Sequence, residues 1–149
     1  MTDSWNKETE AVAALKPKKI LFMCVNNSAR SILAEAIARH YAPAGTVIIS
    51  GGSEPLSVRP QALAVLRESG ISTEGLYSKS IEQIGKMELD LVVTLCAEEV
   101  CPFFPGKVQR MHWGLPDPAA VEGTDDEKLA AFRAVRDELQ VRIKTLLSV

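Results

Sequence analysis

The residues best suited to chemistry lie in one short segment, from Cys24 to Ser31. It follows the apolar run Ile20–Met23 and precedes a helical pattern that begins near Ile32. Backbone N–H groups of such a loop can point inward, and the helix start adds positive charge at the same place. Arg30 presents a rigid donor fork to a tetrahedral oxyanion, and the same field favours the nucleophilic thiolate of Cys24. We interpret the segment as an oxyanion-binding loop with a nucleophile, rather than as a strand closed by a core thiol. Its other members are Val25, Asn26, Asn27, Ser28, Ala29, Arg30 and Ser31.

Length, composition and charge narrow the class of protein. The chain has 149 residues, 46% hydrophobic and 24% charged, which is typical of one soluble globular domain. A net charge of −2 argues against a nucleic-acid binder, and no apolar run is long enough to span a membrane. Residues 1–16 contain no apolar signal core. Three cysteines, an odd number, fit a reducing cytoplasm with functional thiols better than a secreted disulfide framework.

Strand and helix patterns alternate along the chain. Predicted strands cover about residues 18–24, 47–50, 89–96 and 107–112, and predicted helices about residues 32–41, 59–69 and 124–146. This alternation predicts an α/β fold for residues 18–149, with a four-stranded parallel sheet (order 2-1-3-4) and helices on both faces. Residues 1–17 form an N-terminal arm, either a short helix or a mobile segment. Gly51 and Gly52 read as a tight turn, and Thr124 with Glu127 has the spacing of a capping box.

The predicted topology brings a second cysteine to the first. Cys24 ends the first strand and Cys96 ends the third, and these strands are neighbours in the order 2-1-3-4. Cys101 follows five residues later, before Pro102. Because residues five apart on an α-helix are too distant for a disulfide, a bridge between Cys96 and Cys101 needs a non-helical segment, which Pro102 favours. Taken as a set, the three cysteines are consistent with a thiol relay.

The carboxyl group of Asp117 is a further candidate for a catalytic role. Asp117 follows the last strand and precedes Pro118, so its loop should overhang the same end of the sheet, where a carboxyl can exchange protons with a bound oxyanion. Turn formation is the simpler interpretation of this dipeptide. We assign His112 and Trp113 to packing, and His40 to a local role near the end of its helix.

Four motifs together carry a resemblance to a known family. They are Cys24…Arg30-Ser31, the run from Asp90 to Cys96, Cys101-Pro102, and His112-Trp113-Gly114…Asp117-Pro118-Ala119. This combination resembles bacterial arsenate reductases of the thioredoxin-coupled type, which are built on the low-molecular-weight protein tyrosine phosphatase fold. The resemblance covers about residues 18–149. The loop alone would indicate only the wider phosphatase-like superfamily.

The resemblance implies a three-thiol relay. Cys24 attacks arsenate held by the loop and Arg30 while Asp117 protonates the departing oxygen, and phosphate or sulfate would occupy the same loop. Cys96 then attacks Cys24 and releases arsenite. Cys101 resolves the Cys24–Cys96 disulfide, and thioredoxin or another thiol reductant reduces the resulting Cys96–Cys101 bridge. The resemblance also implies that Ser31 stabilises the Cys24 thiolate and that Asn27 holds the shape of the loop.

Two departures from the family pattern concern the loop and its surroundings. Asn26 stands where relatives commonly have Gly, and Asn tolerates left-handed backbone geometry. Some relatives bind potassium through positions that match Asn27, Glu35, Ser50 and an acidic residue, and the acidic position here is Lys79. Its ammonium can replace the ion, so we expect no metal site and no cofactor.

Two other functions remain open on the sequence. A protein tyrosine phosphatase would use Cys24, Arg30 and Asp117 to hydrolyse a phosphomonoester, but no Tyr follows Asp117-Pro118 and hydrolysis does not need Cys96 or Cys101. A non-enzymatic thiol redox sensor or oxyanion-binding module is the other alternative. We expect a cytoplasmic monomer whose partners are arsenate and a thiol reductant, with no nucleic acid or membrane.

Overall fold

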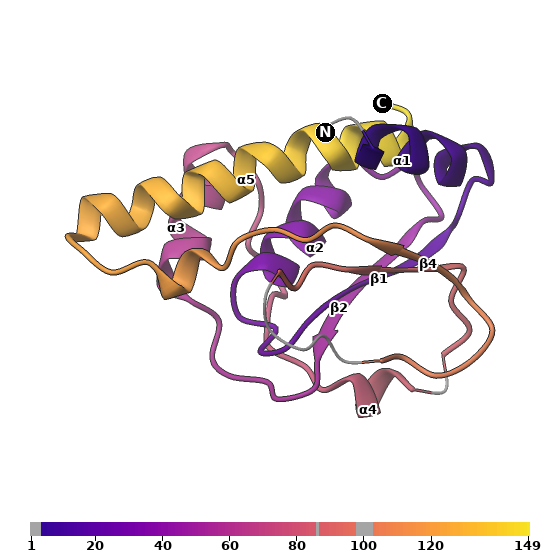
Figure 1. The fold of residues 1–149 in the computed structure, drawn as a ribbon, viewed down its shortest axis with the longest axis horizontal. Coiled ribbons are helices and arrows are strands. Elements are labelled where there is room, and N and C mark those ends of the chain that lie inside the picture. The colour runs from indigo at the N-terminus through magenta and orange to yellow at the C-terminus, as the bar shows by residue number, and fades with distance from the viewer. Residues whose placement is uncertain (1–3, 86, 98–102) are drawn as a thin grey trace.

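Four parallel strands form the centre of the computed structural model, which describes residues 4–85, 87–97 and 103–149 (Figure 1). The strands lie in the order β2-β1-β3-β4, as the sequence predicted. Their bounds are Lys19–Cys24 for β1, Val47–Gly52 for β2, Leu91–Thr94 for β3 and Gln109–His112 for β4. Every residue of β1 from Ile20 onward is buried, because the strand has a neighbour on each side and a packed layer on each face.

The carboxyl ends of the strands meet at one edge of the sheet. Met23 pairs with Thr94 of β3, and Cys24 pairs with Gly52 of β2. Leu95 N then donates to Met23 O at 2.9 Å, so the chain beyond β3 is still tied to β1. This pairing brings the backbones of Cys24 and Cys96 to the same edge, where parallel α/β sheets bind their ligands.

The two faces of the sheet are covered unequally. The helices are α1 (Ser4–Ala14), α2 (Arg30–Tyr41), α3 (Pro60–Glu68), α4 (Ile81–Ile84) and α5 (Asp125–Leu147), with a 3-10 turn η1 at Pro118–Ala120. Helices α1, α2, α3 and α5 lie on one side of the sheet, and α4 lies on the other (Figure 1). The larger core cluster joins β-strand residues such as Phe22 to α2 and α5, while Phe104 and α4 close a smaller cluster.

Helix α5 follows the sequence prediction closely. Thr124 and Glu127 form the capping box, with Glu127 N donating to Thr124 Oγ1 at 3.1 Å and Thr124 N donating to Glu127 Oε1 at 3.0 Å. These bonds hold the pKa of Glu127 below its usual range. The buried positions are Phe132, Val135, Leu139, Ile143 and Leu146, as the spacing of three and four residues predicted.

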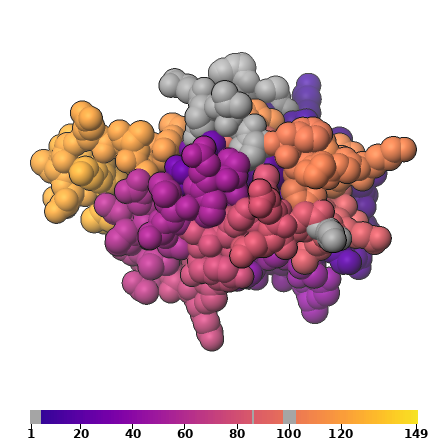
Figure 2. Space-filling model, turned by 90° about the horizontal axis from the view of Figure 1, so that it is seen from below, coloured from indigo at the N-terminus to yellow at the C-terminus, as the bar shows by residue number. Residues whose placement is uncertain are grey.

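Some predicted boundaries were wrong. Gly51 and Gly52 belong to β2 and do not form a tight turn. The strand continues because both glycines pair with the end of β1, and because Gly52 N donates to Lys79 O at 2.9 Å and Gly52 bridges to Ser80. In Figure 2, which shows the molecule from below, the purple segment around these glycines adjoins the rose segment that contains Ser80. Strands β3 and β4 are also shorter than their apolar patterns indicated.

For the N-terminal arm, the sequence allowed either a short helix or a mobile segment. In the structure its residues from Ser4 to Ala14 form α1, which packs against α5. Val12 is buried, and Thr9 has no exposed surface. Among the described residues, no helix is both long enough and apolar enough to span a bilayer.

Candidate active site

The nucleophile predicted from the sequence is the last residue of β1. Cys24 is a free thiol, and its Sγ lies 2.9 Å from Ser31 Oγ. Asn27 Nδ2 donates to the same Ser31 oxygen at 2.7 Å. Because this bond occupies the acceptor side of Ser31, the hydroxyl proton of Ser31 is available to the sulfur. A hydrogen bond donated to sulfur favours its thiolate form.

The loop after Cys24 is held by its carbonyl groups. Those of residues 25 to 28 accept, in this order, from Glu54 N at 2.9 Å, Leu56 N at 3.0 Å, Ser78 Oγ at 2.6 Å and Arg59 N at 2.9 Å. In a trans peptide the following N–H points opposite to the carbonyl, and no described peptide is cis. The N–H groups of residues 26 to 29 therefore point away from the surrounding chain, toward the inside of the loop. Such a set of donors suits a tetrahedral oxyanion.

The start of α2 adds positive charge beside the loop. Ala29 precedes the helix and provides no side-chain cap, and the first helical bond runs from Leu33 N to Ala29 O at 2.8 Å. The positive end of the helix therefore lies beside the loop without a capping side chain from Ala29, as at other anion-binding helix starts. Arg30 begins the helix and is 4% exposed. Its Nη1 donates to Leu115 O at 3.0 Å, which fixes the guanidinium at the strand ends.

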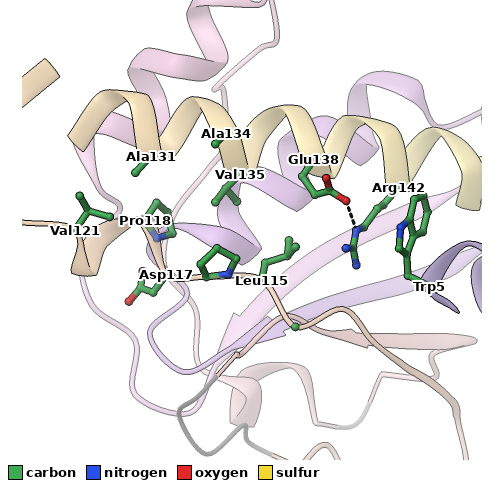
Figure 3. Close-up of a pocket in the computed structure, with 12 residues that line it drawn as sticks. Trp5, Leu115, Asp117, Pro118, Val121, Ala131, Ala134, Val135, Glu138 and Arg142 are labelled. Atoms are coloured by element: carbon green, nitrogen blue, oxygen red, sulfur yellow. Dashed lines mark hydrogen bonds and ion pairs between the residues drawn. The ribbon is translucent and has the colours of Figure 1, made fainter. Parts of the chain in front are cut away.

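Asp117 lies beside Arg30, where the sequence placed it. Its Oδ2 is 3.8 Å from Arg30 Nη2, and its Oδ1 accepts from Ala119 N at 3.0 Å at the start of η1. The carboxyl is partly exposed, so it can exchange protons with water. On the side toward α5, Asp117 borders a cavity of about 590 Å³ whose opposite end is lined by Trp5 and Arg142 (Figure 3).

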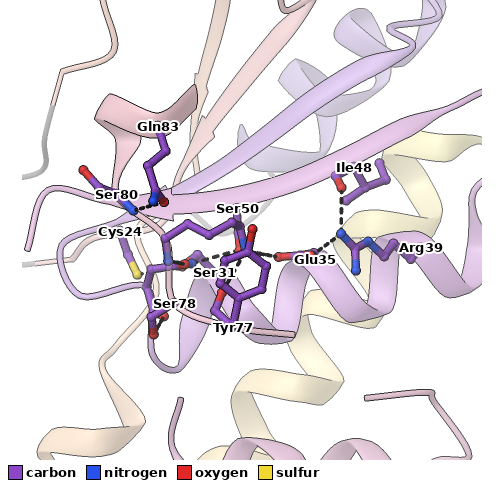
Figure 4. A network of polar contacts seen from close by, with 12 residues as sticks. Cys24, Ser31, Glu35, Arg39, Ile48, Ser50, Tyr77, Ser78, Ser80 and Gln83 are labelled. Carbon is purple, nitrogen blue, oxygen red and sulfur yellow. Dashed lines mark hydrogen bonds and ion pairs between the residues drawn. The ribbon is translucent and has the colours of Figure 1, made fainter. Parts of the chain in front are cut away.

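A buried polar network extends from the loop to the side of Glu35 and Arg39 (Figure 4). Asn27 Nδ2 donates to Ser50 Oγ at 2.9 Å, and Ser50 donates in turn to the Glu35 carboxylate. Asn27 itself has a φ of 48°, so the left-handed residue of the loop is Asn27. Asn26, whose residue type also tolerates this geometry, does not adopt it. Asn26 instead uses its side chain to donate to Glu54 O at 2.9 Å.

The ammonium of Lys79 reaches the buried carboxylate. Lys79 Nζ lies 3.3 Å from Glu35 Oε1 and donates to Tyr77 O at 2.8 Å, and Arg39 pairs with the other carboxylate oxygen. Glu35 has no exposed surface. Two cations therefore balance this carboxylate, as a buried charge requires. Lys79 N also donates to Asn27 Oδ1 at 2.8 Å, which links this ion pair to the loop.

Sequence reasoning missed the residues that hold the loop from outside. A Cβ on Gly52 would stand 2.4 Å from Val25 O, so only glycine permits this approach of β2. Ser78 and the backbone between Glu54 and Leu56 were missed as well, because backbone donors carry no sequence signal. The Gly-Gly pair at the end of a strand was the one signal that could have been interpreted as a close approach.

The other residues that the sequence analysis singled out are two cysteines, two histidines and a tryptophan. Cys96 is 1% exposed and disulfide-bonded. Cys101 lies outside the described residues, so its predicted role stays a prediction. Trp113 is fully buried, as its assignment to packing requires, but His112 is exposed. His40 packs edge-on against Tyr41, with 4.8 Å between ring centroids.

Comparison with known proteins identifies the family. The model of the low molecular weight phosphotyrosine protein phosphatases matches residues 19–149. The chain belongs to this family. An arsenate reductase of Halalkalibacterium halodurans is 44% identical over 133 residues, which are 88% of this chain and 96% of the relative.

Similar solved structures agree with the sequence relatives. A structure described as an arsenate reductase in the phosphate binding state has a TM-score of 0.74 at 32% identity, over 88% of this chain and 97% of its own. A thioredoxin-dependent arsenate reductase of Corynebacterium glutamicum has a TM-score of 0.57 at 28% identity, over 93% of this chain and 70% of its own.

Proposed function

We propose that this protein is an enzyme that reduces arsenate to arsenite by a relay of its three cysteines. The observation that carries the proposal is the loop after Cys24, whose four carbonyls are tied outward so that four amides face inward. Arg30 and the first turn of α2 add the positive charge that an oxyanion needs. Relatives of up to 44% identity over most of the chain are named arsenate reductases, which supports this substrate over a phosphomonoester.

The first step forms a bond between sulfur and arsenic. The Cys24 thiolate attacks arsenate, and Asp117 gives a proton to the departing oxygen, which leaves as water. Cys96 then attacks Cys24 Sγ, and the electron pair of the S–As bond returns to arsenic. Arsenic(V) is thereby reduced to arsenic(III), and the two sulfurs are oxidised to the Cys24–Cys96 disulfide.

The last steps restore Cys24. Cys101 attacks Cys96 and frees the Cys24 thiolate, and a thiol donor reduces the Cys96–Cys101 bridge. The free thiol at Cys24 beside a disulfide-bonded Cys96 agrees with this order of events. The thioredoxin-dependent relative supports thioredoxin as the donor, and a cytoplasmic location would supply it.

A steady-state assay tests the proposal. Arsenite formation from arsenate with a thioredoxin system should require Cys24, and Cys24→Ser should abolish it. Cys101→Ser should stop after one arsenite per protein molecule, with a Cys24–Cys96 disulfide detected by mass spectrometry.

A second substrate separates this enzyme from a phosphatase. Phenyl phosphate hydrolysis needs Cys24, Arg30 and Asp117 but neither of the other cysteines. Rapid hydrolysis without arsenite formation would show a phosphatase, and neither activity in the presence of oxyanion binding would show a sensor or binding module.

A further inference from the structure

The imidazole of His112 is held in one orientation at the catalytic edge of the sheet. His112 ends β4 and pairs with Thr94, which ends β3. Thr94 Oγ1 lies 2.6 Å from His112 Nδ1. Because the two ring nitrogens lie on opposite sides of the imidazole, this bond directs Nε2 away from Thr94.

The Nε2 side of the His112 ring lies toward the backbone of Cys96. A Cβ on Gly114 would lie 3.2 Å from His112 Nε2 and 3.5 Å from Cys96 O, so the ring and the Cys96 backbone meet over the same glycine. Two bonds fix this meeting, from Trp113 N to Thr94 O at 2.7 Å and from Leu115 N to Leu95 O at 3.2 Å. Gly114 thus leaves room for an imidazole beside the backbone of Cys96.

Cys96 needs such a group if it is to attack Cys24. Only a thiolate is a competent nucleophile, and a buried thiol holds its proton more tightly than an exposed one. Cys96, which is disulfide-bonded in this structure, is 1% exposed, whereas His112 is exposed and can pass a proton on to water. His40, the other histidine, lies late in α2 against Tyr41.

We propose that His112 Nε2 takes the proton of the reduced Cys96 thiol as that sulfur attacks Cys24, a role that rests on the proposed relay. Nδ1–H then donates to Thr94 Oγ1, which leaves the Nε2 lone pair for the proton. The new S–S bond forms with the Cys96 electron pair, the S–As pair reduces arsenic, and the imidazolium returns the proton to solvent.

The charged groups near His112 come from two elements. Glu8 of α1 and Arg110 of β4 line the same cavity of about 290 Å³ as His112. The Arg110 guanidinium stacks 4.3 Å from the ring centroid of Phe103 and donates to Gly106 O at 2.8 Å. A carboxyl group and a guanidinium therefore line the cavity that His112 borders. Only the neutral imidazole has a free lone pair at Nε2, so only that form can accept the proton.

The test isolates the second step in a Cys101→Ser background. After mixing with arsenate, the rate of Cys24–Cys96 disulfide formation is measured from about pH 5 to 9 by quenching with an alkylating agent and mass spectrometry. The parent rate should rise as histidine loses its proton. His112→Gln should slow this step on the order of 10²–10⁴-fold near neutral pH. The deficit should shrink at high pH, where hydroxide ionises the thiol directly.

Two further variants serve as a second test and as a control. Thr94→Val keeps the shape of the side chain but removes the acceptor for Nδ1–H, and it should also slow the step near neutral pH. His40→Gln should leave the rate unchanged. A His112→Gln profile equal to the parent, or slower by one factor at every pH, would overturn the proposal. If the Cys101→Ser parent released no arsenite, the relay itself would fail, and the role of His112 with it.

Discussion

Gly52 lies at the point where β2 comes closest to the oxyanion-binding loop. A side chain there would meet Val25 O at 2.4 Å, and the nearby Asn27 N at 3.0 Å. Both contacts are with the backbone of the loop. This backbone cannot move without turning the N–H groups of residues 26 to 29 that point into the loop. We expect Gly52→Ala to weaken phosphate binding by about tenfold or more, ~1.4 kcal/mol, as measured by calorimetry.

Gly85→Ala is the matched control for this substitution. Of the atoms in the described part of the chain, its Cβ would come within 4 Å of Glu82 O and Ile81 O alone, at 3.5 and 3.7 Å. Phosphate affinity should stay at the parent value in this variant. Equal affinity in Gly52→Ala and the parent would contradict the idea that the closeness of β2 shapes the loop.

Lys79 provides a second test at the residue scale. Its ammonium lies 3.3 Å from the buried Glu35 carboxylate, at the position that the family resemblance matched to an acidic ligand of potassium. Lys79→Asp removes one cation from the network and adds a carboxyl group. We expect this variant to be destabilised by roughly 3–5 kcal/mol in sodium or choline chloride.

Potassium should restore part of that stability. The melting temperature of Lys79→Asp is expected to rise with potassium chloride more than with choline chloride at equal ionic strength. Lys79→Met, which adds no ligand, serves as the control and should show no such difference. A parent protein that responds to potassium as strongly as Lys79→Asp would contradict the replacement of the ion by the ammonium.

At the scale of elements, one carboxylate joins α3 to α5. Glu68 near the end of α3 pairs with Arg133 at 2.7 Å and with Arg136 at 2.9 Å. The hydrogen bond from Arg133 is the main cause that lowers the pKa of Glu68 from 4.5 to about 2. Since the folded pKa is the lower one, this stabilisation is present above pH 4.5 and is lost as the pH falls toward 2.

We therefore expect Glu68→Gln to flatten the dependence of stability on pH between about 4.5 and 2. Urea unfolding at several pH values measures this slope. Asp137→Asn is the matched control, because Asp137 also contacts Arg136, at 2.9 Å, but bonds only within α5. The assignment would be wrong if Glu68→Gln lost as much stability on acidification as the parent.

Prediction from sequence succeeded for elements whose signals are local. The capping box at Thr124, the repeat of apolar residues along α5 and the apolar run of β1 each depend on residues within a few positions of one another. Gly51 and Gly52 were misassigned because their partners are distant in sequence: both pair with the end of β1, and Gly52 also pairs with Lys79 and Ser80. Local glycine chemistry indicates a turn, and only tertiary pairing extends the strand.

The candidate site also has features that local sequence signals predicted and features that they did not. Residue types and spacing placed Cys24, Arg30 and Ser31 together because one strand, one loop and one helix position all three. The geometry of Asn27 and Asn26 was not predictable from their types, because both tolerate left-handed backbone. The donors that hold the loop come largely from the backbone of residues 54–59, and any residue type provides that group.

On the scale of the whole molecule, α1 ties the N-terminal residues to the segment that contains β4 and Trp113. Thr9 has no exposed surface and accepts from Trp113 Nε1 at 3.1 Å, while its hydroxyl proton points to Met111 Sδ at 3.5 Å. Trp5 adds a second contact, with the Arg142 guanidinium 4.8 Å from its ring centroid. Residues 4–14 precede the part of the chain that the family model matches, yet they satisfy a buried donor within it.

Removal of that single hydroxyl should therefore weaken the entire fold. Thr9→Val keeps the volume of the side chain but leaves the buried Trp113 N–H without its acceptor. We expect a loss of about 1–3 kcal/mol in the free energy of unfolding, measured by urea denaturation with an unchanged m-value. Thr9→Ser retains the hydroxyl and loses one methyl group, which costs about 0.8 kcal/mol. If Thr9→Val were as stable as Thr9→Ser or more so, the packing of α1 would depend on apolar contact alone, and the bond to Trp113 would contribute nothing to stability.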